Sequence, residues 1–106
     1  MQFNITIDQE PFALDIPDGV LAETKSIVAD MDADFSKGIQ LGRYWIDEPS
    51  DEQRCQLAAN KIVNAIHQED VRSFYVMGAY VLSKFPALKM ITVDSNYEID
   101  DIDIQA

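Results

Sequence analysis

The most suggestive group of ligating side chains is an alternating run of carboxylates, Asp30, Asp32 and Asp34. Carboxylates at positions 1, 3 and 5 begin the calcium-binding loop of an EF-hand. The rest of that loop is missing, because Phe35 stands where the sixth position requires glycine and Leu41 stands where the twelfth requires glutamate. We therefore interpret the run as the end of an amphipathic helix and expect no metal site there.

Cys55 and His67 are the only cysteine and the only histidine of the chain. On one continuous helix their sequence separation would place them about 18 Å apart along the axis, too far for a thiol–imidazole pair. A structural zinc site needs more such ligands than these two. We expect Cys55, on an apolar stripe, to be a small buried hydrophobe, and His67 to interact with the last carbonyl groups of its helix.

Motifs for other chemistry are missing from the sequence. The nucleotide-loop patterns G-x-x-x-x-G-K-S/T and G-x-G-x-x-G do not occur, and no nucleophile elbow surrounds a serine. We therefore expect a protein that is not an enzyme and holds no cofactor. A small enzyme or enzyme subunit stays open as an alternative, and it would need a concave pocket with converging polar groups.

One segment, residues 42–46, has the residue types of a protein-binding surface. Arg43, Tyr44 and Trp45 belong to the types most enriched at binding hot spots, and Arg43 could stack on either ring. The only tryptophan of a small domain is, however, more often an anchor of its core. Two interpretations stay open, Trp45 in the core or Trp45 at an interface, and both hold if Trp45 points inward and Tyr44 outward.

The charge balance narrows the classes of partner. The chain has 19 acidic and 8 basic residues, a formal net charge of −11. Such a charge disfavours direct binding to nucleic-acid phosphates and to anionic membranes. It allows a protein partner, including a basic one, and it also serves solubility. An acidic mimic of nucleic acid that occupies a basic protein cleft is a second alternative.

The composition describes one soluble domain. A chain of 106 residues with 47% hydrophobic residues suffices for a single core but not for two. No apolar run reaches the roughly 18 residues of a membrane span, and the N-terminus alternates like a strand instead of resembling a signal peptide. A lone cysteine fits a reducing compartment, so we expect a cytoplasmic protein.

Hydrophobic periodicity predicts the elements in turn. Period-two alternation predicts a hairpin of strands near residues 3–8 and 12–16, with a turn at residues 9–11. Helical spacing predicts helices over residues 19–35, 51–68 and 71–85. Asp18, Ser50 with Gln53, and Asp70 are the expected N-caps. Gly78 within the third helix is expected to allow close approach of another element.

Two regions give weaker predictions. Residues 39–47 fit a short helical turn or an extended connector packed by its aromatic residues. A strand is expected near residues 88–93, followed by a turn at Ser95 and Asn96. The acidic tail, residues 97–106, is either an edge strand, within this chain or against a partner, or disordered.

The predicted order is β-β-α-α-α-β. This is an α+β domain over residues 1–106, with helices packed on one face of a small sheet. We expect a non-catalytic protein–protein interaction module with Arg43, Tyr44 and Trp45 as candidate contact residues. Its partner is another protein, or a second copy that forms a homodimer.

Overall fold

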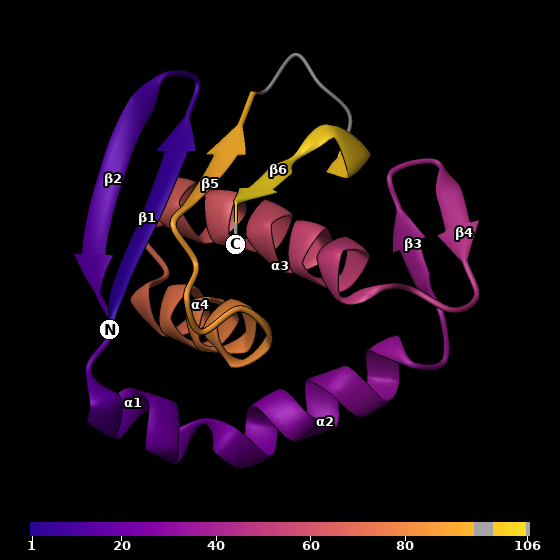
Figure 1. The fold of residues 1–106 in the computed structure, drawn as a ribbon, viewed down its shortest axis with the longest axis horizontal. Coiled ribbons are helices and arrows are strands. Elements are labelled where there is room, and N and C mark those ends of the chain that lie inside the picture. Colours follow the sequence, from indigo (N-terminus) through magenta and orange to yellow (C-terminus); the bar gives the residue numbers. More distant parts are fainter. Residues whose placement is uncertain (95–98, 106) are drawn as a thin grey trace.

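The computed structural model describes residues 1–94 and 99–105. A four-stranded mixed sheet forms one layer, in the order β2-β1-β5-β6 (Figure 1). Its strands are β1 (Gln2–Ile7), β2 (Glu10–Asp15), β5 (Met90–Val93) and β6 (Asp103–Gln105). β1 runs parallel to β5, and the other two pairings are antiparallel. The first strand, β1, therefore pairs in the middle of the sheet with a strand from the C-terminal part of the chain, β5.

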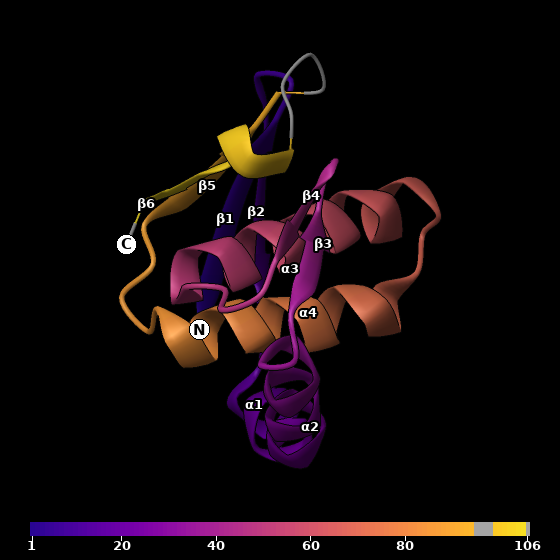
Figure 2. The ribbon, with the colours of Figure 1, turned by 90° about the vertical axis from the view of Figure 1, so that its right-hand side faces the viewer.

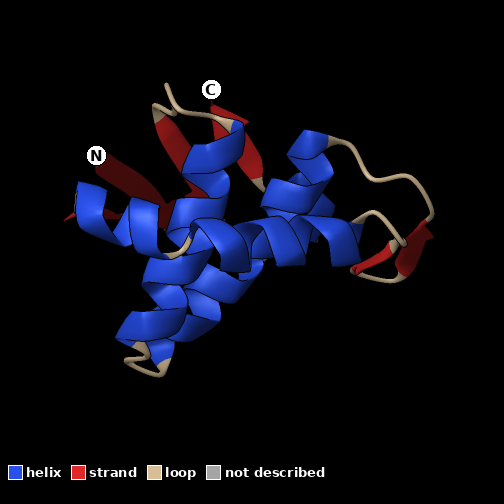
Figure 3. Ribbon diagram, turned by 90° about the horizontal axis from the view of Figure 1, so that it is seen from below, coloured by secondary structure: helices blue, strands red, loops and turns tan. Residues whose placement is uncertain are grey.

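The helices complete the α+β architecture that the sequence predicts. α3 (Asp51–His67) and α4 (Val71–Lys84) lie side by side and cover one face of the sheet. α1 (Asp18–Glu23) and α2 (Lys25–Phe35) pack along α4 on the side away from α3 (Figure 2). The remaining elements are a small hairpin, β3 (Ile39–Leu41) with β4 (Tyr44–Ile46), and a 3-10 turn, Ile99–Asp101. Figure 3 shows the small hairpin at the opposite end of the helices from the main sheet.

Alternation along β1 decides which face of the sheet is buried. Phe3, Ile5 and Ile7 are buried and face the helices. Through the parallel register, Ile5 and Ile7 continue into the buried Ile91 and Val93 of β5. The residues between them are more polar and lie on the open face. Alternate residues of the two central strands, β1 and β5, thus supply the core, as expected for a sheet covered on one side.

The predicted hairpin is confirmed, but its turn lies at residues 8–9 and not at the predicted residues 9–11. The turn is Asp8-Gln9, both left-handed with φ of 50° and 71°, as a two-residue type I′ turn requires. Pro11 lies within β2 opposite Thr6. Met1 and Ile16 form a hydrogen-bonded pair of the antiparallel ladder, with N···O distances of 2.8 and 2.7 Å. Because hydrogen-bonded and non-hydrogen-bonded pairs alternate along such a ladder, Thr6 and Pro11 form a non-hydrogen-bonded pair. The backbone nitrogen of Pro11, which has no hydrogen to donate, therefore points away from β1. Pro11 thereby blunts the free edge of the sheet.

The single helix predicted over residues 19–35 is interrupted at Thr24. The Thr24 hydroxyl donates to the Val20 carbonyl oxygen at 2.7 Å, and the backbone of Thr24 has φ −90° and ψ 0°. A threonine that bonds back to the preceding turn competes with the helix and bends it. The predicted Asp18 cap is also wrong, because Pro17 occupies the N-cap and Asp18 is the first helical residue.

The caps predicted for the two long helices are confirmed. Ser50 and Gln53 form a reciprocal capping box at α3, and the Asp70 carboxylate accepts from the Ser73 N–H at α4. The close approach predicted at Gly78 is also present, because an added Cβ would lie 2.5 Å from Cδ1 of Ile16. Gly78 therefore lets α4 approach the end of the N-terminal hairpin.

The C-terminal segment joins the sheet as an edge strand. β6 pairs with β5 in the register Met90 to Gln105 and Thr92 to Asp103. Buried Gln56 of α3 donates to the Ile102 carbonyl at 2.9 Å and fixes this segment over the helix. The turn predicted at Ser95 and Asn96 lies outside the described residues.

Candidate functional site

Residues 39–46 form a hairpin, which was neither of the two predicted conformations. Ile39 pairs with Ile46, and Leu41 pairs with Tyr44. Gly42 opens the connecting turn with φ 62°, a value that suits the first position of a type II′ turn. Ile39 and Leu41 are buried, and β3 contacts α3. The inner side of β3 therefore anchors the hairpin to the domain.

Trp45 lies on the outer face of this hairpin, and its interpretation as a core residue is wrong. The side chain is 58% exposed. The physical reason is register: Ile39, Leu41 and Ile46 occupy the inner face, so Trp45, opposite Gln40, must point outward. The sequence could not decide this because three-residue strands carry too little alternation.

Although exposed, the Trp45 indole is held in place. Its Nε1 donates to the Asp47 carboxylate at 2.7 Å. Its ring lies against Gly38, where an added Cβ would be 2.5 Å from Cζ2 of the indole. Gly38 also has φ 112°, a conformation that L side chains rarely adopt. Because Gly38 has no Cβ, the indole can lie close against the chain there while much of it stays open to solvent.

Tyr44 and Arg43 complete the tip of the hairpin. The Tyr44 ring is 54% exposed, and the Arg43 guanidinium carbon lies 5.7 Å from its centroid, within cation–π range. Successive strand residues point to opposite faces, so Tyr44 and Trp45 flank the ribbon from two sides. The structure brings the three predicted contact residues together on one projecting element, which we call the β3–β4 tip (Arg43, Tyr44 and Trp45).

Asp32, considered above as a calcium ligand, instead joins three helices. It accepts hydrogen bonds from Arg54 at 2.7 Å, Tyr80 at 2.8 Å and Lys84 at 3.0 Å. Burial alone would raise the pKa of Asp32, but the bonds from Lys84, Tyr80 and Arg54 outweigh it and lower the pKa to about 2. Burial, and then the bond to Asp32, raises the pKa of Tyr80. Two cations already neutralise this carboxylate, which fits a structural tie between α2, α3 and α4.

Cys55 and His67 both lie on the uninterrupted helix α3, so the predicted separation of about 18 Å holds. Cys55 is fully buried, and burial raises the pKa of its thiol to about 12. Within residues 1–94 and 99–105, no three cysteine, histidine, aspartate or glutamate side chains are grouped closely enough to hold a metal ion.

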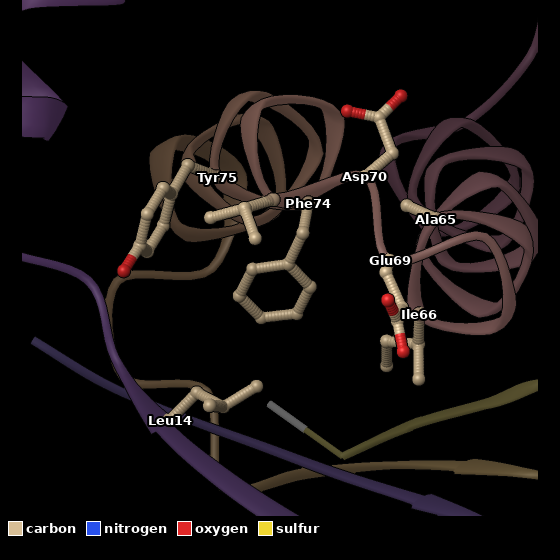
Figure 4. A pocket seen from close by; sticks show the side chains of 8 residues that line it. Leu14, Ala65, Ile66, Glu69, Asp70, Phe74 and Tyr75 are labelled. Atoms are coloured by element: carbon tan, nitrogen blue, oxygen red, sulfur yellow. The ribbon is translucent and has the colours of Figure 1, made fainter.

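Sequence reasoning missed a second surface, at the other end of α3. A hollow of about 330 Å³ opens between Leu14 of β2 and the start of α4, with Phe74 at its base (Figure 4). A second hollow, of about 540 Å³, opens on the other side of Val71 and Tyr75, toward α1 and α2. The two hollows share Val71 and Tyr75, and we call them together the α4 groove. The available signal was the apolar face of α4, which is wider than one packing partner can cover.

Within the described residues, no helix is long and apolar enough to cross a membrane. Comparison of the chain with protein-family models, with curated proteins and with solved structures gave no match.

Proposed function

We propose that this protein is a non-catalytic cytoplasmic interaction module that binds another protein through the β3–β4 tip. The observation that carries the proposal is Trp45, which is 58% exposed and yet fixed by Asp47 and Gly38. The free, buried thiol of Cys55 is compatible with a reducing compartment.

A fixed aromatic side chain favours binding for two reasons. Burying the open side of an indole removes a large apolar area from water, which makes tryptophan a frequent binding hot spot. A side chain that is already held in one orientation also loses little conformational entropy on association. Trp45 meets both conditions, and the Arg43–Tyr44 pair offers a second aromatic contact on the opposite face of the same hairpin.

The charge around the tip favours a partner with basic residues. Asp47 and Glu48 follow directly after β4, and the whole chain carries a net charge of −11. An apolar pocket rimmed by lysine or arginine would complement both the indole and these carboxylates. The same charge disfavours nucleic acid, anionic membranes and a second copy of this chain as the partner.

The second candidate, an acidic mimic of nucleic acid, rests on the net charge alone. Some of the carboxylates have a structural role, because Asp32 bonds to side chains of two other helices and Asp70 caps α4. A mimic would depend on many carboxylates at once and little on one indole. The two proposals therefore predict different responses to salt and to the loss of Trp45.

The experiment starts from affinity capture in a lysate of the native host, followed by titration of the purified partner. Trp45 is the only tryptophan of the chain, so its emission reports its own environment. With a tryptophan-free fragment of the partner, the emission should shift to shorter wavelength on binding, and Trp45→Ala should weaken affinity by roughly 2 kcal/mol, about thirtyfold.

Val71→Ser is the matched control, because Val71 is equally exposed at 60% but lies at the far end of α3. It should leave the affinity of a tip-binding partner unchanged. A partner that binds Trp45→Ala as tightly as the wild type, without an emission shift, would refute the proposal. Release of that partner by moderate salt from both proteins would favour the mimic instead.

A further inference from the structure

The α4 groove is an apolar surface separate from the β3–β4 tip. Val71 stands 60% exposed at its centre, and Leu14 and Ile27 are exposed at its two ends. Isolated exposed apolar residues are ordinary, but exposed apolar residues that line two adjoining hollows mark an interaction surface. α3 has 17 residues, so about 25 Å of helix separates this groove from the tip.

The rim of the groove is acidic. Its charged lining residues are Glu23, Glu69 and Asp70 against one base, Arg72. Figure 4 shows the Glu69 carboxylate beside Ile66, where α3 turns into α4, and the Asp70 carboxylate on the side of that turn away from Leu14. An occupant must therefore combine an apolar face with flanking positive charge.

Glu69 supplies the most specific part of this rim. It follows α3 in a left-handed conformation, φ 57°, with the Asp70 N–H bonded to Ala65 and the Glu69 N–H bonded to Ile66. This is the Schellman arrangement, in which glycine is the favoured residue because it has no Cβ to strain. Glutamate at this position makes the fold less stable than glycine would, and it places a carboxylate at the mouth of the groove.

We propose that the α4 groove binds a basic amphipathic helix of a partner protein. Two hollows on either side of Val71 and Tyr75 suit apolar side chains from successive turns of one helix face, and lysine or arginine beside them would meet Glu23, Glu69 and Asp70. This surface is separate from the β3–β4 tip, and its occupancy does not depend on the function proposed for the tip.

Two other occupants fit less well. A strand added to β2 would meet Pro11, whose missing N–H lies on the free edge. A second copy of this chain would bring a like acidic rim against this one, at a net charge of −11 on each chain.

The test uses a labelled helical peptide of roughly 15–20 leucines and lysines, with leucine at helical spacing on one face. Binding to the full chain is followed by fluorescence anisotropy. A peptide of the same composition in scrambled order and an amphipathic leucine–glutamate peptide are the ligand controls. We expect the basic amphipathic peptide to bind about tenfold or more tightly than either control.

The variants separate shape from charge. Val71→Ser and Glu69→Gln should each lower the affinity for the basic amphipathic peptide about fivefold or more. Glu48→Gln removes the same unit of charge far from the groove and should change affinity less than twofold. Glu69→Gly should raise the midpoint of unfolding and at the same time lower the affinity for the peptide. A loss of binding in this variant would therefore not result from a loss of stability. Trp45→Ala should leave the peptide affinity unchanged, whether or not the tip has a partner.

Three results would overturn the proposal. The scrambled peptide could bind as tightly, or Glu48→Gln could weaken binding as much as Glu69→Gln, and either would show diffuse charge attraction. Sedimentation could show a dimer of the wild type that Val71→Ser dissociates, and the groove would then be an interface between copies.

Discussion

Replacing Asp32 with asparagine should remove a pH-dependent part of the stability. Burial would raise the pKa of Asp32, but hydrogen bonds from Lys84, Tyr80 and Arg54 outweigh it and lower the pKa from its ordinary value of 3.8 to about 2 in the folded chain. At about 1.4 kcal/mol per unit this corresponds to roughly 2 kcal/mol. The Asp32 side chain is 31% exposed, so solvent screening reduces the expected contribution to about 1–2 kcal/mol.

The sign follows from proton linkage. The folded-state pKa lies below the unfolded value, so the unfolded chain binds more protons between pH 4 and pH 2. The stabilisation is complete above about pH 4, and roughly two thirds of it is lost by pH 2.5. Asp32→Asn lacks this contribution, so wild type and variant should differ most at neutral pH and converge in acid.

Urea unfolding followed by far-ultraviolet circular dichroism at pH 7, 4 and 2.5 measures the difference. Tryptophan emission is a poor probe of folding here, because Trp45 is already exposed in the folded chain. Asp34→Asn is the control, since Asp34 is 76% exposed and has a Lys37 contact of 3.6 Å. It should change stability by less than about 0.5 kcal/mol. If the free energies of unfolding of the wild type and Asp32→Asn differed equally at pH 7 and at pH 2.5, the electrostatic reasoning would be refuted.

Two further predictions concern the core. Gly78→Ala should destabilise the protein by about 1–2 kcal/mol despite the better helix propensity of alanine, because the new methyl group overlaps Cδ1 of Ile16. Adding Ile16→Val, which removes that atom, should recover part of the loss in urea unfolding, whereas a stabilising Gly78→Ala would contradict the close approach. Cys55 should react with a thiol reagent only on unfolding, since burial excludes the reagent and raises the pKa of the thiol to about 12. A fast reaction of the native protein in a stopped-flow assay would show that α3 opens readily.

The sequence predicted those features that local chemistry determines. The capping box at Ser50 and the apolar stripe of α3 need only neighbouring residues, and both are present. The same holds for the alternation of β1 and for the glycine at position 78, whose only reasonable use within a helix was close packing. The fold class followed from the order of these elements.

Features that depend on distant partners could not be predicted. One local feature was also missed: Thr24 interrupts a helix whose apolar periodicity runs through it, because its hydroxyl donates to the nearby Val20 carbonyl oxygen. The outward direction of Trp45 depends on register with β3, and the role of Asp32 depends on donors from two other helices. The α4 groove arises only when β2, α1 and α4 come together in space.

The parallel pairing of β1 with β5 also bears on how the chain acquires its structure during synthesis. β1 ends at Ile7, and its central partner, β5, ends at Val93. At ordinary elongation rates, about 4–17 s separate the synthesis of these two strands. Through that interval the N-terminal hairpin, alone, is at best marginally stable, and the inner edge of β1 lacks its partner. Pro11 protects only the outer edge of the hairpin, on β2. The edge of β1 that β5 covers in the complete domain therefore stays open to other chains during synthesis.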